Sequence, residues 1–356
     1  MRIPFALLSC CAFLHSAHAD EMTSHIEQIG DGHTIELSQN AGLFDFQNAA
    51  TIQQTGISQT TRIEQSVEIS GSNSAFVEQH GSENIAEITQ LATHEASHSA
   101  SVRQSGQNNF AKIFQGDIGG INNFAEVNQE GNGNEANIRQ GGWDPTATAI
   151  VRQIGSLNVV DVNQGGFSTP STADILMEGS SNRASVAQGY VESSINSAAI
   201  EVVGNFNSAE IRQHAEGQNN VSIQQIGSFN IATSQQLFSA FAESAITQEG
   251  PGNTANVLQR GSLGRGSNTS SVAQEGSANI AEVTQAGRDI FNEPDNQASI
   301  IQSGDHNTAR VTQTGANMSE VEIRGSLNLV TISQNGQSNS VISVQGNSNT
   351  AIITQQ

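Results

Sequence analysis

The chain contains very few cysteine, proline, aromatic and basic residues, and each shortage excludes a class of protein. Among 356 residues there are 2 Cys, 5 Pro and 13 Lys plus Arg, aromatic residues make up 4%, and the formal net charge is -21. A chain this acidic, without a basic stripe, is not expected to bind nucleic acid or an anionic membrane. Its 35% hydrophobic content is below that of ordinary globular domains, so the length does not imply two such domains.

Both cysteines lie in the first 19 residues, MRIPFALLSCCAFLHSAHA, which have the features of a secretory signal peptide. One Arg precedes a short apolar run, and Ala17–Ala19 is a small-x-small cleavage signal. We therefore predict that residues 1–19 are removed and that residues 20–356 form a secreted chain without thiol, disulfide or cysteine-metal site. Lipid attachment at Cys10 is an alternative that would leave a very short apolar segment. No later stretch approaches the roughly 20 apolar residues of a membrane helix, so membrane insertion is not expected.

One repeated pattern occupies most of the remaining chain. It reads QHGSENIAEITQ from Gln79 to Gln90 and QEGSANIAEVTQ from Gln274 to Gln285. The glutamines that close successive units are alternately 11 and 13 to 15 residues apart, so two arms form one coil of roughly 25 residues. A few arms are closed by Glu178, Val203 or Arg324 instead. Counting these, the sequence predicts about 28 arms and about 14 coils.

The alternation of residues within each arm predicts a strand. In the arm Asn279–Gln285, alternate residues (Asn279, Ala281, Val283 and Gln285) share one face, whereas the residues between them change freely from arm to arm. A helix would need apolar residues three and four apart. The glycine between arms supplies a positive φ for a turn. We therefore expect an all-β fold, a β-solenoid of about 14 stacked strand-turn-strand coils, which forms a rod on the order of 65 Å long.

The repeated amides are poor core formers unless they are stacked. An unpaired buried amide costs about 1 to 3 kcal/mol, whereas an amide above an identical residue one coil away can donate and accept along the axis. Register is then strict, because a one-residue slip would turn Glu and Arg inward. The residues predicted to form this inward ladder are Gln79, Asn84, Gln90, Gln129, Asn134, Gln140, Gln153, Asn158, Gln164, Gln274, Asn279, Gln285, Gln302, Asn307, Gln313, Gln334, Asn339, Gln345, Asn349 and Gln355.

Both ends of the predicted solenoid are expected to be open. Asn349–Gln355 is a regular arm followed only by Gln356, and Ser24, Ile26 and Gln28 already fit the inward face. Uncapped strands invite head-to-tail addition of further copies.

The motif Gln-x-Gly-x-x-Asn-x-Ala-x-x-x-Gln, as in Gln129–Gln140, resembles the curlin repeat, and the resemblance covers nearly the whole chain after Ala19. It implies a subunit of a curli-like functional amyloid, exported through an outer-membrane pore with accessory factors and assembled at the cell surface, where it supports adhesion and biofilm matrix. It further implies a nucleator subunit as partner, and inward Gln and Asn that drive polymerisation. The chain departs from short curlins in its many coils, in lacking a separate targeting segment, and in the degenerate arms of residues 167–203, whose charged residues would slow aggregation before export.

No motif indicates an enzyme, a cofactor or a metal site. His94 and His98 are close in sequence, but both are expected to be exposed in a loose turn. The carboxylates are scattered, and Gly264–Gly266 lacks the strand and helix that flank a phosphate loop.

Two other functions stay open at this point: the minor nucleating subunit of the same fibre, and a monomeric β-solenoid adhesin or binding module. The latter would present arrays of similar outward residues, commonly Thr, and would end in caps. Outward Phe76, Phe110, Phe124 and Phe229 fit sideways bundling of rods and simple strand propensity equally well.

Overall fold

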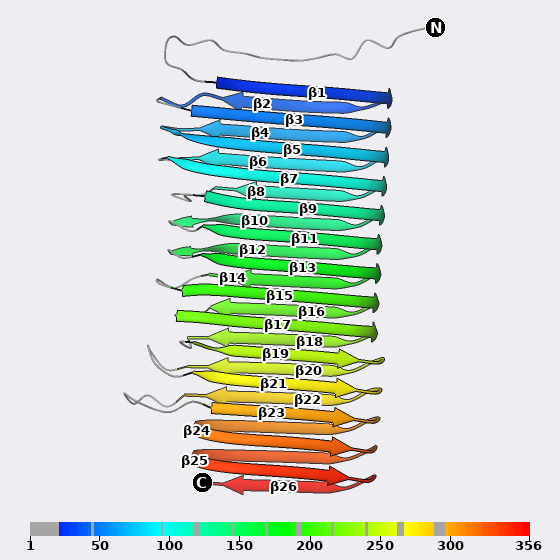
Figure 1. Cartoon of the computed structure of the whole chain (residues 1–356), viewed down its shortest axis with the longest axis vertical. Coiled ribbons are helices and arrows are strands. Elements are labelled where there is room, and N and C mark those ends of the chain that lie inside the picture. Colours follow the sequence, from blue (N-terminus) through cyan, green and yellow to red (C-terminus); the bar gives the residue numbers. More distant parts are fainter. Residues whose placement is uncertain are drawn as a thin grey trace.

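The computed structural model describes residues 21–356 except 44–45, 94, 117–121, 144–145, 168–169, 190–193, 215–216, 239–240, 262–266 and 288–295. The predicted signal peptide lies outside the described residues. The described chain is all-β and forms a parallel β-solenoid whose coils stack along one axis (Figure 1), which confirms the predicted fold class. It contains no helix long and apolar enough to cross a membrane.

Parallel pairing between every second strand divides the solenoid into two faces. The odd sheet contains β1 (Glu21–Asp31), β3 (Phe46–Ile57), β5 (Gly71–Ser82), β7 (Ala96–Gln107), β9 (Asn122–Asn132), β11 (Ala147–Ser156), β13 (Ser171–Ser180), β15 (Ser194–Asn205), β17 (Gly217–Ser228), β19 (Glu243–Glu249), β21 (Asn268–Glu275) and β23 (Asn296–Ser303). The even sheet contains β2 (Thr34–Asn40), β4 (Thr60–Val67), β6 (Ile85–Ala92), β8 (Phe110–Gln115), β10 (Glu135–Trp143), β12 (Val159–Phe167), β14 (Arg183–Gln188), β16 (Ser208–His214), β18 (Ile231–Leu237), β20 (Thr254–Arg260), β22 (Ile280–Ala286) and β26 (Thr350–Gln355).

Two long strands, β24 (Thr308–Arg324) and β25 (Leu329–Gln345), belong to both sheets. The first part of β24 pairs with β22 and its second part with β23, and β25 follows the same course. Counting each as two arms, the 26 described strands make 28 arms and 14 coils, in line with the predicted number.

Two kinds of turn form the two edges of the rod. The tight-turn edge, on the right in Figure 1, consists of the turns from an odd strand to the next even strand, such as residues 155–158. There Gly155 has φ +119°, and a Cβ on it would lie 2.0 Å from the carbonyl oxygen of Gly179 in the next coil, so only glycine fits. Leu157, in the same turn, is also left-handed at φ 57°. The loose-turn edge consists of the turns from an even strand to the next odd strand, such as residues 68–70.

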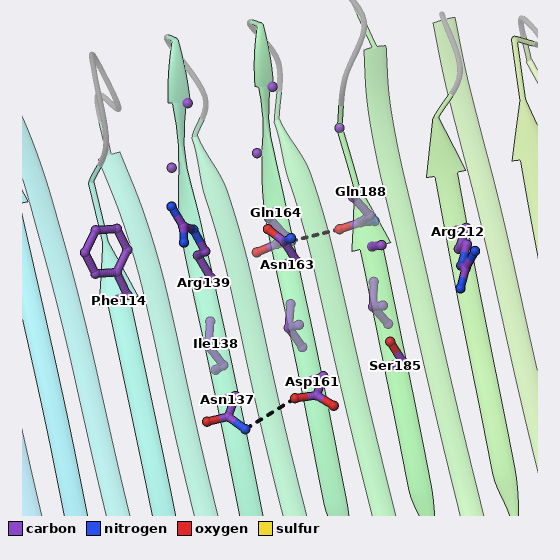
Figure 2. A pocket seen from close by; sticks show the side chains of 18 of the residues that line it. Phe114, Asn137, Ile138, Arg139, Asp161, Asn163, Gln164, Ser185, Gln188 and Arg212 are labelled. Carbon is purple, nitrogen blue, oxygen red and sulfur yellow. Dashed lines mark hydrogen bonds between the residues drawn. The ribbon is translucent and has the colours of Figure 1, made fainter.

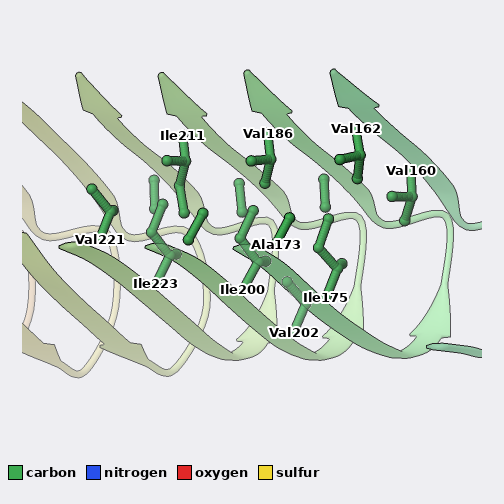
Figure 3. Close-up of a cluster of buried hydrophobic side chains, with 14 of the residues drawn as sticks. Val160, Val162, Ala173, Ile175, Val186, Ile200, Val202, Ile211, Val221 and Ile223 are labelled. Carbon is green, nitrogen blue, oxygen red and sulfur yellow. The ribbon is translucent and has the colours of Figure 1, made fainter. Parts of the chain in front are cut away.

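The core is a thin layer between the sheets, built from the inward positions of the period-two alternation. Val162, Val186 and Ile211 of the even sheet face Ile175 and Ile200 of the odd sheet (Figure 3), and all are buried. Burial of each such side chain stabilises the fold by roughly 1.5 to 3 kcal/mol. One apolar row from each sheet leaves most of the remaining inward positions to small residues and amides.

Charged residues lie on the outer faces, as the predicted register requires. Lys112 Nζ lies 2.9 Å from Glu87 Oε2 and Arg183 Nη2 lies 3.0 Å from Asp161 Oδ2, in each case between neighbouring coils. A one-residue slip would bring these groups into the apolar layer, where an ion pair seldom recovers its desolvation cost.

Candidate functional site

The most extensive polar feature of the interior is an unbroken row of glutamines along the even sheet, termed the continuous glutamine ladder. In every rung Nε2 donates to Oε1 of the glutamine one coil later, at 2.8–3.1 Å. Its members are Gln39, Gln65, Gln90, Gln115, Gln140, Gln164, Gln188, Gln213, Gln236, Gln259, Gln285, Gln313, Gln334 and Gln355.

Each of these glutamines also ties the two sheets together. Its Nε2 donates to the backbone carbonyl 16 residues earlier in the odd sheet, as from Gln90 to Ser74 and from Gln285 to Thr269, both at 2.9 Å. A primary amide has two N–H donors, so one serves the axis and the other crosses the rod. Both donors of a buried side chain are thereby satisfied.

The odd sheet carries a second glutamine row, but this row is interrupted. Bonds of the same kind join Gln28, Gln54, Gln79, Gln104, Gln129 and Gln153, and then Gln225, Gln248, Gln274 and Gln302. The rungs between and beyond hold Met177, Val202, Ile323 and Val344. At one break the Oε1 atom of Gln225 is buried without a hydrogen-bond partner.

These apolar rungs correct the predicted closing positions. Glu178, Val203, Arg324 and Gln345 were expected to close their arms inward, but each lies one residue past the rung and faces outward or toward the turn. The reason is the turn glycine, which stands two residues after every rung of the odd row, as Gly155 stands after Gln153. The close contact with the next coil requires glycine at the turn, whereas the rung accepts either an amide or an apolar side chain.

An asparagine ladder lies beside the continuous glutamine ladder, at the start of the even strands. After the first member, Asn84, the backbone N–H of each asparagine donates to Oδ1 of the preceding rung at 2.9–3.1 Å. Its bonds therefore run in the direction opposite to those of the glutamines. Its members are Asn84, Asn109, Asn134, Asn158, Asn182, Asn207, Asn230, Asn253, Asn279, Asn307, Asn328 and Asn349.

This ladder also holds the tight turns in place. Asn279 Nδ2 donates to the carbonyl oxygen of Gly304 in the next coil at 2.7 Å, and Asn84 Nδ2 does the same to Gly106 at 3.0 Å. The Asn of one repeat thus contacts the Gly of the next repeat, between neighbouring coils.

Eighteen of the twenty predicted ladder residues lie in these three rows, and Asn339 and Gln345 do not. The even row holds Gln90, Gln140, Gln164, Gln285, Gln313, Gln334 and Gln355; the odd row holds Gln79, Gln129, Gln153, Gln274 and Gln302; the asparagine ladder holds Asn84, Asn134, Asn158, Asn279, Asn307 and Asn349. Asn339 is exposed, because Ser338 occupies the inward rung and its N–H donates to Asn317 Oδ1 at 3.1 Å. Gln345 is exposed beside the inward Val344.

His98 corrects a further expectation, since it is buried at 2% exposure instead of lying in a solvated turn. It takes the place of an asparagine in the odd-sheet row between Asn73 and Asn123, six residues before Gln104. His98 Nε2 lies 3.1 Å from the carbonyl oxygen of Leu91. Desolvation by burial lowers its pKa from 6.5 to about 4, against a smaller raising effect of the Leu91 bond. His94 lies outside the described residues.

Three buried polar atoms around this imidazole have no hydrogen-bond partner: Asn73 Oδ1, His98 Nδ1 and Asn123 Nδ2. The ring is too rigid to repeat the amide-to-amide bonds of the neighbouring coils. The substitution therefore weakens the stack locally. In the sequence, His98 stands six residues before Gln104, as Asn84 stands six residues before Gln90, and this spacing could have identified His98 as an inward residue.

An open groove of about 1120 Å³ lies on the outer face of the even sheet (Figure 2). Arg139, whose guanidinium lies 5.2 Å from the centre of the Phe114 ring, stands at one end, and Arg212, paired with Glu210, stands at the other. Asn163 and neighbouring glycines also line the groove. These charged groups already have partners on the sheet. Among the described residues no cluster of three or more His, Cys, Asp or Glu could hold a metal ion.

Comparison with known protein families identifies one segment of the repeat. Residues 294–322 match the family model described as Curlin associated repeat. No curated protein matches the chain. The matched segment includes Gln302 and Gln313, one rung of each glutamine row, and the same inward positions recur in the coils on both sides of it. The match, together with this recurrence, supports membership of the curlin family of repeat proteins.

Proposed function

We propose that the chain is the structural subunit of a curli-like extracellular amyloid fibre that grows by templated head-to-tail stacking of copies. The polarity of the continuous glutamine ladder carries this proposal. Each rung donates toward the next coil and accepts from the preceding one, so the last rung, Gln355, and the first, Gln39, present complementary atoms. A copy stacked in register would extend the row with the same bond that joins every interior rung.

The terminal coils support the same mode of growth. In the described chain β1 pairs along one edge with β3, and β26 pairs along one edge with β25. Ile353 is only partly buried, whereas Ile332, its equivalent one coil earlier, is buried at 1% exposure. Ile26, Ile35 and Leu37 are partly buried at the other end. Stacking would bury these side chains and pair the free strand edges.

The curlin family suggests an extracellular or cell-surface location. We further propose that the fibre supports adhesion and biofilm matrix, and that a nucleator subunit and an outer-membrane export pore with accessory factors are partners besides further copies of the chain. The signal-peptide features of residues 1–19 support export.

Dilution of denatured residues 20–356 into buffer tests the proposal. We expect thioflavin-positive fibres with the ~4.7–4.8 Å cross-β repeat and a lag that preformed seeds remove. A chain that stays monomeric in sedimentation at high concentration would overturn the proposal and favour a solenoid binding module. A chain that forms few fibres but removes the lag of another curlin at substoichiometric amounts would instead be a nucleator.

A matched pair of variants tests which surface supports growth. Ile353→Asp places a carboxylate on the inward face of β26, whereas Ile352→Asp places it on the outward face, where Ile352 is 68% exposed. We expect the first variant to stop growth at the end that exposes β26 and the second to elongate normally. Equal elongation by both would exclude β26 from the growing surface.

A further inference from the structure

Four phenylalanines of this chain combine a left-handed backbone with exposed rings. Phe206, Phe229, Phe238 and Phe241 have φ of 56°, 61°, 54° and 59°. Their exposed fractions are 56%, 61%, 58% and 57%. All four fall within two neighbouring coils, between β15 and β19.

Folding does not require phenylalanine at the first two of these places. The equivalent tight-turn residue is Ser181 one coil before Phe206 and Gly252 one coil after Phe229, and the turn hydrogen bonds are the same. A left-handed backbone costs a bulky residue roughly 1 to 3 kcal/mol, and the exposed ring recovers little of this by burial. A cost that the monomer offsets only in part points to a contact outside it.

The tight-edge pair, Phe206 and Phe229, forms a small apolar surface. The two rings are stacked, with centroids 5.1 Å apart and planes inclined by 4°. Ile226 beside them is also exposed, and residues 203–207 and 226–230 contain no charged side chain. In a chain of net charge -21, an uncharged pair of turns such as this is a place where two copies can approach closely.

The loose-edge pair, Phe238 and Phe241, lies on the opposite edge of the rod, after β18. β18, residues Ile231–Leu237, begins just after the turn of Phe229, crosses the rod in Figure 1 and ends just before Phe238. Phe229 and Phe238 thus stand at opposite ends of one strand, and Phe206 lies in the tight turn one coil before Phe229.

We propose that these two pairs form a lateral contact between neighbouring fibres of this chain, the tight-edge pair of one copy against the loose-edge pair of a copy in the next fibre, in axial register. The proposal rests on the fibre proposed above. A contact that joins two different patches on opposite edges repeats without closing, and therefore builds flat arrays of fibres.

The size of the patches explains why the contact would act only between fibres. Four half-exposed rings offer on the order of 400 Å², far below the roughly 1,200 Å² of a stable protein interface. Two free copies would therefore not pair. In a fibre every subunit repeats the contact at the same height, and the weak contacts add through effective concentration.

Two double variants separate this contact from fibre growth. The tight-edge variant is Phe206→Ser with Phe229→Ser, and Ser occupies the equivalent turn in Ser181 and Ser348. The loose-edge variant is Phe238→Ser with Phe241→Ser. Fibres of each are grown separately, labelled in different colours, and examined alone and mixed by fluorescence and electron microscopy.

We expect unmodified fibres to form side-by-side arrays and the bundled fraction of either variant alone to fall roughly tenfold, as truncation of aromatic anchors does. Mixing the two variants should restore pairs that contain one fibre of each colour, because each retains the patch that the other lacks. Seeded elongation should be unchanged, as in the control Phe124→Ser, which lies 37% exposed on an outer face.

Single unmodified fibres, variants that bundle normally, or a mixture without two-colour pairs would each overturn the lateral contact. None of these outcomes bears on the proposed fibre, which is tested separately by whether the unmodified chain forms fibres. If a double variant does not assemble, Phe229→Gly, with the residue of Gly252 one coil later, gives the same comparison.

Discussion

The Nε2 atom of Gln140 lies 2.9 Å from the Oε1 atom of Gln164, one coil further along the chain, and both side chains are buried. Gln140 also donates to the carbonyl oxygen of Phe124 and accepts from Gln115. A buried amide is costly in a core unless all its groups are paired, and here the stack pairs them. Repetition of one motif thus turns an unfavourable residue into one that specifies register.

Replacement of an interior rung should therefore cost more than replacement at a break. Gln140→Met removes the partner of Gln115 and of Gln164, and we expect a loss of unfolding free energy of about 2 kcal/mol. Gln153→Met is the comparison, because it removes a glutamine partner on one side only, that of Gln129: its next rung is already Met177, and Gln153 Nε2 donates locally to Asn158 O at 2.9 Å. Urea unfolding of freshly diluted protein measures both. A larger loss for Gln153→Met would contradict the role assigned to the continuous row.

Substitution of the turn glycines should lower stability most where the next coil is in close contact. Gly155→Ala and Gly336→Ala both place Ala at a left-handed φ, of +119° and +108°, but only the first brings a Cβ to 2.0 Å from a backbone oxygen. Gly336 has no atom within 4 Å of that position. Both should lose about 1 to 3 kcal/mol to backbone strain. We expect Gly155→Ala to lose at least about 1 to 3 kcal/mol more through the clash. Similar thermal midpoints for the two would argue against close packing of the tight turns.

His98 should make stability fall as the pH is lowered. Its folded pKa of about 4 lies below the unfolded value of 6.5, so between these pH values the unfolded state binds more protons. The stability is present above pH 6.5 and is lost as the pH falls toward 4, by on the order of 3 kcal/mol. His214, whose pKa is lowered by desolvation and by Arg212, acts in the same direction.

His98→Asn restores an amide to the rung and should stabilise the chain while removing most of this pH dependence. Urea midpoints at pH 7 and 4.5 for the two proteins give the comparison, and His80→Asn, at an exposed side chain, serves as control. An unchanged difference between the two pH values in His98→Asn would exclude this imidazole as its source.

Asp305 offers a local test of the tight-turn geometry. The Ser277 hydroxyl and backbone N–H donate to Asp305 Oδ1 at 2.7 and 2.8 Å across coils, and these two bonds lower the pKa of the carboxyl group. Ser277→Ala should raise that pKa toward its ordinary value in a carboxyl NMR titration. Ser326→Ala, which removes a hydroxyl near Asp305 N and not near its carboxylate, should leave it low. Identical titrations in both variants would contradict the contact.

The fold and most of the rungs could be predicted from the sequence because one pattern serves both the core and the turns. Alternation alone identified the face that holds Asn279 and Val283. The wrong predictions arose where the amide pattern of the core and the glycine pattern of the turns point to different residues. At Val344 the inward rung is apolar and the neighbouring Gln345 is polar, so the amide pattern predicted the wrong residue. The position of Gly346, two residues after the rung, marks the correct register.

Other features depend on three-dimensional context that a linear pattern does not contain. The burial of His98 follows from its place between Asn73 and Asn123 in neighbouring coils, far apart in the chain. The pairing of Phe206 with Phe229 depends on consecutive tight turns adopting the same left-handed backbone.

In the proposed fibre the amide stack continues from one copy to the next. Cryo-electron microscopy of fibres grown from residues 20–356 would show this junction. We expect Gln39 of each copy to stack in line with Gln355 of the copy before it, in parallel register, with an amide-to-amide distance of about 2.9 Å. Fibres in which the terminal glutamines face solvent, or in which neighbouring copies pair antiparallel or out of register, would contradict it.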